Sequence, residues 1–213
     1  MSKKEMLDTF TKQLEFIDVR SRDEVHRLGL WHQTFHCWLL QQEMGKNYIL
    51  FQKRYAYKKD YPGFLDITAA GHLEAGEKPL DGIRELHEEL GIELEVEELI
   101  SVGIIPCLLS TETIIDNEFG HVYLVDYSKR TEPFQLQSDE VESIIRVEFE
   151  KFRSLRQGYS EVIVGSDLTT GIAGQEVRLT WADFLPHSES YYESVEREFE
   201  QFFNAKQKLT HEK

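Results

Sequence analysis

The 213-residue chain contains few cysteines and no long apolar run. Its two cysteines, Cys37 and Cys107, lie in separate apolar segments, which argues against a disulfide framework and suits a reducing compartment. No apolar run approaches the roughly 20 residues that a membrane helix needs. The N-terminal sequence "MSKKEMLDTFTKQLEF" also lacks the apolar stretch of a signal peptide. We therefore expect a cytoplasmic protein without a membrane partner.

Basic residues are also scarce. The sequence contains 24 lysines and arginines against 39 aspartates and glutamates, which gives a formal net charge of -15. Such a charge repels a phosphate backbone, which argues against broad nucleic-acid binding. A small phosphorylated ligand would need metal ions between its phosphates and the protein.

The hydrophobic content of 40% is enough for one sizeable core. We predict a single domain over 1–213, with 150–213 as a C-terminal helical region. Residues 1–30 are predicted as an N-terminal extension, which starts with a helical lead-in over 1–15 and continues with a short strand over 16–19. Apolar and aromatic runs predict strands over 34–41, 47–57, 98–109, 117–127 and 141–150, the first two joined by a hairpin turn at Gly45. The expected fold class is α+β or an α/β/α sandwich, with a mixed β-sheet flanked by helices.

A strongly acidic segment, "AAGHLEAGEKPLDGIRELHEELGIELEVEEL", covers residues 69–99. Pro79 and Gly91 bracket a helix of about three turns within it. Helical periodicity places Leu80, Ile83, Leu86 and Leu90 on the core side and Asp81, Glu85, Glu88 and Glu89 on the opposite side. One interpretation is an ordinary solvated acidic face. The other is an all-oxygen site beside a glycine loop, which suits the hard cations Mg²⁺ or Mn²⁺.

The stretch "GHLEAGEKPLDGIRELHEELGI" resembles the signature of the Nudix hydrolases: a Gly, five residues, a Glu, seven residues, then Arg-Glu-apolar-any-Glu-Glu-any-Gly-apolar. Its places are filled by Gly71, Glu77, Arg84, Glu85, Leu86, Glu88, Glu89, Gly91 and Ile92. The signature has seven residues between its Glu and its Arg, but here only six, 78–83, separate Glu77 from Arg84. A contact between these two side chains is therefore left open.

The resemblance implies a metal-dependent pyrophosphohydrolase that cleaves a diphosphate linkage in a nucleoside diphosphate or related small molecule. Glu85, Glu88 and Glu89 would hold Mg²⁺ or Mn²⁺. Gly71, Glu77, Arg84 and Gly91 would be structural residues of the motif. Family enzymes are often dimers, so a homodimer is expected.

A wider resemblance, from Val19 to Asp126, is to the branch that contains the type I isopentenyl-diphosphate isomerases and their hydrolase relatives. It rests on "RDEVHRLGLWHQTFHCWLL", "LFQKRYAYKKDYPGFLDITAAGH" and "DNEFGHVYLVDY". In those isomerases histidines and glutamates bind a second metal, and a cysteine before the Gly-His pair does proton chemistry. The residues near the metal-ligand positions are His26, His32, His72 and Glu118, with Asp116 where a further carboxylate would be. Ala70 replaces the cysteine and cannot transfer a proton, which favours hydrolysis.

Several roles stay open at this level. Glu88 and Glu118 are both candidates for the base that accepts the proton of the attacking water. Lys53, Arg54 and His72 are candidates for substrate binding, although the first two could be ordinary exposed strand residues. Packing is an equal alternative for His72 and the better interpretation for His32 and His36.

Two other functions stay open. An isomerase-like enzyme would need Cys37 or Cys107 in the pocket. A non-catalytic nucleotide-binding module usually lacks the helix carboxylates, which are present here. Residues 150–213 contain no motif that assigns a role, and "GSDLTTGIAGQEVRLTWADF" is expected to form a turn-rich lid or a dimer contact.

Overall fold

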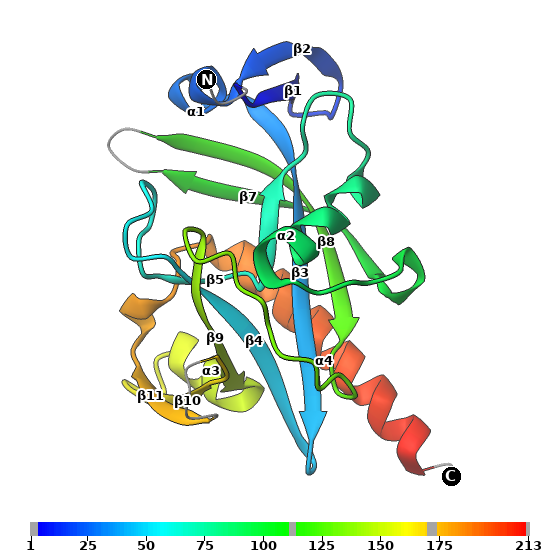
Figure 1. Ribbon diagram of the computed structural model, residues 1–213, viewed down its shortest axis with the longest axis vertical. Coiled ribbons are helices and arrows are strands. Elements are labelled where there is room, and N and C mark those ends of the chain that lie inside the picture. Colours follow the sequence, from blue (N-terminus) through cyan, green and yellow to red (C-terminus); the bar gives the residue numbers. More distant parts are fainter. Residues whose placement is uncertain (1–3, 111–113, 170–173, 212–213) are drawn as a thin grey trace.

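The computed structural model describes residues 4–110, 114–169 and 174–211, which fold around one large mixed sheet (Figure 1). Its strands are β1 (Met6–Phe10), β2 (Phe16–Ser21), β3 (Trp31–Glu43), β4 (Lys46–Arg54), β5 (Leu65–Asp66), β6 (Ala69–His72), β7 (Ile100–Ser110), β8 (Ile115–Asp126), β9 (Val141–Glu148), β10 (Ile163–Asp167) and β11 (Gln175–Leu179). The α-helices are α1 (Arg22–Leu28), α2 (Arg84–Leu90), α3 (Phe149–Arg156) and α4 (Glu189–His211). The 3-10 turns are η1 (Pro79–Ile83), η2 (Val96–Glu98) and η3 (Trp181–Asp183).

The long strand β3 organises the sheet. It pairs antiparallel with β4 and β6 and parallel with β8, while β7 continues the sheet beyond β8. The predicted hairpin between β3 and β4 is confirmed. Met44 and Gly45 both have positive φ at its turn, the combination that a tight hairpin requires.

Both faces of β3 are buried, so its side chains alternate between two cores. Trp38 and Leu40 belong to the core that α3 and α4 cover, whereas Phe35 and Leu39 belong to the core that α2 covers. In Figure 1, α2 and α4 accordingly lie on opposite sides of β3. The predicted α/β/α arrangement is therefore confirmed.

The last helix, α4, is amphipathic as its apolar spacing predicts. Tyr192, Val195, Phe199 and Phe203 are all buried, and Phe199 packs edge-on against Trp38 with ring centroids 5.3 Å apart. Burying each such side chain contributes about 1.5–3 kcal/mol. This apolar stripe is part of the core, so it is not free to make a dimer contact.

The predicted helical lead-in over 1–15 is wrong. Residues 6–10 and 16–21 form the β1–β2 hairpin, and Thr9 of β1 pairs with His32 of β3. Leu7 and Thr9 are buried between more exposed neighbours, a period of two that indicates a strand. The pairing that selects the strand is with β3, which lies more than twenty residues further along the chain.

The description of 150–213 as helical is incomplete, because β10 and β11 lie between α3 and α4 and extend the sheet from β9. The stretch expected as a lid or dimer contact supplies these strands, apart from residues 170–173, which lie outside the described residues. Trp181 and Phe184, which follow β11, pack against Phe152 of α3. No helix in the described ranges is both long and apolar enough to cross a membrane.

Candidate functional site

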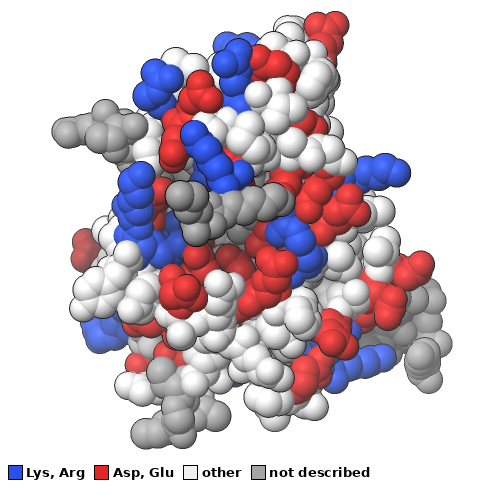
Figure 2. All heavy atoms as spheres, turned by 45° about the horizontal axis from the view of Figure 1, so that its top comes forward, with Lys and Arg blue, Asp and Glu red and all other residues white. Residues whose placement is uncertain are grey.

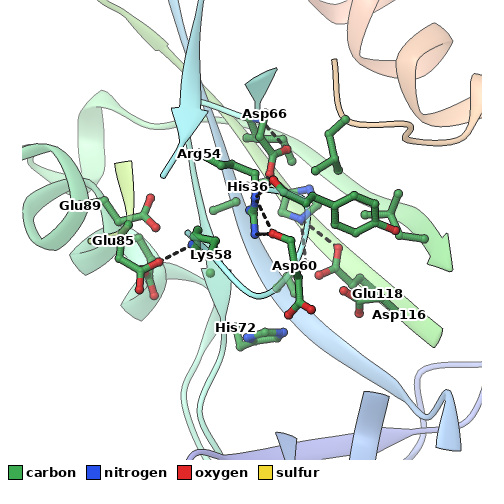
Figure 3. Close-up of a pocket in the computed structure, with 18 of the residues that line it drawn as sticks. His36, Arg54, Lys58, Asp60, Asp66, His72, Glu85, Glu89, Asp116 and Glu118 are labelled. Carbon is green, nitrogen blue, oxygen red and sulfur yellow. Dashed lines mark hydrogen bonds and ion pairs between the residues drawn. The ribbon is translucent and has the colours of Figure 1, made fainter. Parts of the chain in front are cut away.

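A cavity of about 320 Å³ opens between α2, β6, the loop after β4, β8 and the segment before α4. In Figure 3, Glu85 and Glu89 lie on one side of it and Asp116 and Glu118 on the other, with the side chain of Arg54 between them. Acidic and basic side chains are interspersed on the face of the molecule shown in Figure 2. The cavity brings together charged residues that are far apart in the sequence.

The acidic helix begins as the 3-10 turn η1, with Pro79 at its first position, and continues as α2 until Gly91 ends it in the left-handed conformation. Arg84 contacts Glu77 through two hydrogen bonds, of 3.1 Å from Nε and 3.0 Å from Nη2. A 3-10 turn rises about 2.0 Å per residue against about 1.5 Å in an α-helix. The greater rise of the 3-10 turn offsets the one residue by which the spacer between Glu77 and Arg84 is short. The contact between these two side chains, which the sequence left open, is therefore made.

The three motif glutamates of α2 have different environments. Glu89 is only 6% exposed, Glu85 is mostly buried, and the Glu88 side chain is 53% exposed and lies 3.6 Å from Arg84. Glu89 is buried because α2 packs this face over the cavity, so the interpretation of an ordinary solvated acidic face fails for this residue. Asp81 also has another role, since it accepts a hydrogen bond from the Lys78 amide and caps η1.

A close approach between β6 and α2 explains one glycine of the motif. A Cβ atom at Gly71 would overlap the carboxyl group of Glu85. Any other residue would displace that carboxyl group from the cavity. Gly71 therefore lets Glu85 lie against the strand.

The donor set around Glu89 fits a divalent cation. Burial, and then the charge of Glu85, raise the pKa of Glu89 to about 8, and burial also raises the pKa of Glu85. Gln52 donates to Glu89 at 3.3 Å, and its own Oε1 is buried without a hydrogen-bond partner among the described residues. Clustered oxygen ligands with unbalanced negative charge are what Mg²⁺ and Mn²⁺ require.

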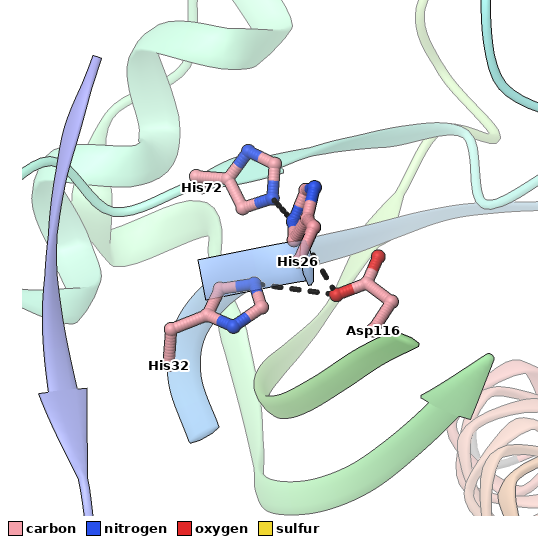
Figure 4. A group of neighbouring side chains, drawn as sticks. All are labelled: His26, His32, His72 and Asp116. Carbon is pink, nitrogen blue, oxygen red and sulfur yellow. Dashed lines mark hydrogen bonds and ion pairs between the residues drawn. The ribbon is translucent and has the colours of Figure 1, made fainter. Parts of the chain in front are cut away.

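A second group of possible ligands lies across the cavity from α2. Four side chains each offer one ligand atom, and these atoms lie within 4.8 Å of one another (Figure 4): His26, His32, His72 and Asp116. His32 Nε2 and Asp116 Oδ1 are 3.4 Å apart, and neither has a hydrogen-bond partner in the part of the chain that the structure describes. Burial lowers the pKa of His26 to about 4 and that of His32 to about 3.

The neutral imidazole is the form that binds a metal ion through one ring nitrogen. In two of these rings the second nitrogen has a partner that holds the ring in place. His32 Nδ1 lies 3.1 Å from the Leu30 carbonyl, and His72 Nδ1 lies 3.1 Å from Glu5. The group therefore fits a second metal ion. Its carboxylate is Asp116, whereas Glu118, which the sequence placed beside the histidines, lies outside this group of four.

Glu118 lines the cavity from β8, two residues after Asp116. Its Oε2 is 3.4 Å from His36 Nε2. Burial alone would raise the pKa of Glu118, but the hydrogen bond with His36 holds it well below its usual range. Burial and the charge of Glu118 raise the pKa of Asp116. Of the two neighbouring carboxyls, Glu118 is the one held ionised.

Arg22, Arg54 and Lys58 are the lysine and arginine side chains that line the cavity in the described ranges, and the last two lie near the α2 carboxylates. Arg54 donates to Asp66 at 3.0 Å and to the Asp60 carbonyl at 2.9 Å, and Lys58 forms an ion pair with Glu140. Lys53 does not line the cavity and lies 2.6 Å from Glu142 instead. Neighbouring strand residues point to opposite faces, so Arg54 and Lys53 could not both reach the same phosphate. The loop residue Lys58 was missed because no periodicity orients a loop side chain.

The sequence comparisons agree with this geometry. The family model of the NUDIX domain matches residues 30–163. The chain belongs to the Nudix family. Along 91% of its length it is 36% identical to an uncharacterized Nudix hydrolase of Clostridium acetobutylicum, of which it covers 96%. It is also 37% identical over 156 residues to Nudix hydrolase 3 of Arabidopsis thaliana, covering 70% of this chain but only 20% of that longer protein.

A solved structure shows the same fold. A Deinococcus radiodurans protein, DR0079, superposes with a TM-score of 0.52 at 19% identity, covering 73% of this chain and 90% of that one. Nudix hydrolases generally act on diphosphate linkages and use divalent metals, which agrees with the carboxylates of α2.

The chain beyond the matched Nudix segment also reaches the cavity. Leu185 and His187 line it, although no sequence pattern marked either residue. His187 Nε2 lies 2.9 Å from Asp66, the carboxylate that holds Arg54, and its Nδ1 lies 3.1 Å from Cys107 Sγ. The segment before α4 therefore supports the Nudix pocket directly.

Neither cysteine lines the cavity. Cys37 and Cys107 are fully buried, whereas Ala70, which the resemblance to the isomerases aligned with their cysteine, does line it. Burial raises the pKa of both thiols far above the ordinary value.

Proposed function

We propose that this Nudix protein is a metal-dependent hydrolase of a diphosphate linkage in a small molecule, such as a nucleoside diphosphate compound. One observation carries the proposal: Glu85 and Glu89 face Glu118 across a single cavity that Arg54 also lines. This arrangement offers metal ligands, a base and a phosphate-binding cation around one substrate-sized space.

In this proposal Glu85, Glu88 and Glu89 hold Mg²⁺ or Mn²⁺. When bound, the ion would neutralise the diphosphate and acidify the attacking water. The guanidinium of Arg54 and the ammonium of Lys58 bind phosphate oxygens. His72 contributes with His26, His32 and Asp116 to a second ion site rather than to direct substrate binding.

Glu118 is the better candidate for the base. Its side chain is only 12% exposed and lines the cavity across from Glu85 and Glu89, where a carboxylate can accept the proton of the attacking water. Glu88 is half exposed and lies beside Arg84, which fits a ligand or charge-balancing role. Ala70 and the cysteines outside the cavity argue against isomerase chemistry, and the complete set of α2 carboxylates argues against a module that only binds.

The proposal is tested by product release from a panel of nucleoside diphosphate sugars, dinucleoside polyphosphates, ADP-ribose, NADH, coenzyme A and isoprenoid diphosphates, with Mg²⁺ or Mn²⁺. Glu89→Gln is compared with Glu97→Gln, a matched change at an exposed residue outside the cavity. We expect metal-dependent cleavage by the wild type and by Glu97→Gln that collapses in Glu89→Gln. Binding without cleavage in all three proteins would indicate a sensor instead. The homodimer and the cytoplasmic location stay predictions.

A further inference from the structure

The first turn of α4 contacts His36, which lines the cavity, through Tyr191, a residue outside the matched Nudix segment. Tyr191 is fully buried, and its hydroxyl is 2.9 Å from His36 Nδ1. The other ring nitrogen, Nε2, lies 3.4 Å from Glu118 Oε2 and 3.0 Å from Thr34 Oγ1. Tyr191, His36 and Glu118 thus form a chain of contacts from α4 through β3 to β8.

Tyr191 and Glu118 lie at the two ends of these contacts, and their chemistry determines which ring nitrogen of His36 carries the hydrogen. Burial holds the pKa of Tyr191 well above its ordinary value, so the phenol keeps its proton and can donate. At the other end, Oε2 of Glu118 lies 3.4 Å from Nε2, and a carboxylate oxygen is an acceptor. An imidazole between a donor and an acceptor satisfies both when Nδ1 accepts and Nε2 carries the hydrogen. Thr34 fits this arrangement because a hydroxyl can accept as well as donate.

The imidazole is also held by its packing. A Cβ atom at Gly120 of β8 would lie 2.7 Å from His36 Cε1 and Nδ1, so the ring occupies the space that a side chain would need. The His36 and Tyr191 rings meet edge to face, with centroids 5.6 Å apart.

We propose that Tyr191 is a positioning residue of the active site, which fixes the tautomer of His36 so that its Nε2–H orients the carboxylate of Glu118. This inference rests on the proposed role of Glu118 as the base. It assigns a function to the C-terminal helix, which carries no Nudix motif. It also explains why a buried histidine and a buried tyrosine face each other beneath the cavity.

The kinetic test compares Tyr191→Phe with Tyr192→Phe. Tyr192 is the matched control because it is equally buried and donates one hydrogen bond, of 2.7 Å, to the Leu185 carbonyl. We expect Tyr191→Phe to lower kcat by about 10-fold with KM changed by less than about twofold, the size of effect seen when a supporting hydrogen bond is removed. Tyr192→Phe should keep both constants. Equal effects of the two changes would overturn the inference while leaving the hydrolase function intact.

A second test reads the tautomer and needs no turnover. Long-range ¹H–¹⁵N spectra of histidine-labelled protein distinguish the two ring nitrogens, and His36→Gln identifies the His36 signals. We expect the Nε2–H tautomer in the wild type and in Tyr192→Phe, and its loss or mixing in Tyr191→Phe. An Nδ1–H or doubly protonated ring in the wild type would overturn the inference. If the wild type cleaves no compound of the panel, the proposed function fails and this inference fails with it.

Discussion

Arg84 binds both carboxylate oxygens of Glu77 across a spacer that is one residue shorter than the Nudix signature. The same guanidinium donates to the His72 carbonyl at 3.1 Å, so it ties the start of α2 to the end of β6. The contact therefore fixes the loop against which the metal-ligand candidates of α2 are held.

Replacing this arginine should destabilise the motif. Arg84→Lys keeps the charge but loses the planar pair of donors, and we expect the free energy of unfolding to fall by about 1–2 kcal/mol. Urea denaturation measures the change. Arg130→Lys is the control, because Arg130 pairs with the more exposed Glu98 and Glu132 and lies outside the cavity. A loss of equal size in both variants would show that the contact between Arg84 and Glu77 contributes no more to stability than the exposed ion pairs of Arg130.

The histidine group should bind a metal ion independently of α2. We expect two Mn²⁺ ions per wild-type chain and one per chain in His26→Gln, because the amide cannot replace the imidazole nitrogen in the group. Titration followed by electron paramagnetic resonance counts the ions. His87→Gln, at a histidine whose side chain is 66% exposed, should still bind two. An unchanged count in His26→Gln would refute the second site.

The stability that Asp66 contributes should depend on pH. Burial alone would raise its pKa, but the hydrogen bond and charge of His187 and the charge of Arg54 hold the pKa well below the ordinary value. The unfolded chain therefore takes up this proton more readily than the folded one. The contribution is complete above the unfolded pKa of about 3.9 and is lost as the pH falls below it.

Asp66→Asn should consequently be less stable than the wild type by about 3 kcal/mol at pH 7, since it breaks a buried ion pair. The difference should shrink when urea denaturation is repeated near pH 3, where Asp66 of the unfolded wild-type chain has taken up a proton while the folded carboxyl is still ionised. Asp139→Asn, at an exposed residue, should show little loss at either pH. A difference that stays constant between the two pH values would contradict the assignment.

Neither thiol should react in the folded protein. Cys37 and Cys107 are fully buried, and burial raises the pKa of both, so little thiolate is present and a reagent must wait for unfolding. We expect a maleimide to modify the native protein at least about 100-fold more slowly than the protein in urea, as followed by mass spectrometry. Rapid labelling of one cysteine in the native protein would show that it reaches the cavity.

The α2 part of the site could be predicted because its information is local. The spacing of Glu85, Glu88 and Glu89 along one helix decides where their side chains lie, and Gly91 marks where the helix ends. The burial of Glu89 was missed, because periodicity orients a face but does not say what packs over it.

The remaining residues of the site depend on pairings between distant strands. His32 stands opposite Glu118 in the parallel β3–β8 pair, a register that no local pattern reveals. β1 was mistaken for a helix because its pairings with β2 and β3 select a strand, whereas the short strand over 16–19 was predicted. His187 and Tyr191 carried no signal at all, because only the packing of α4 against the sheet brings them beneath the cavity.

The position of His187 and Tyr191 also sets an order of events during synthesis. The ribosome releases the acidic helix about a hundred residues before these two side chains. The nascent Nudix segment therefore emerges without the helix that covers one of its two cores, and its Arg54 and Glu118 lack their supports. Any enzymatic activity should consequently appear only after α4 has been made and has docked against the sheet.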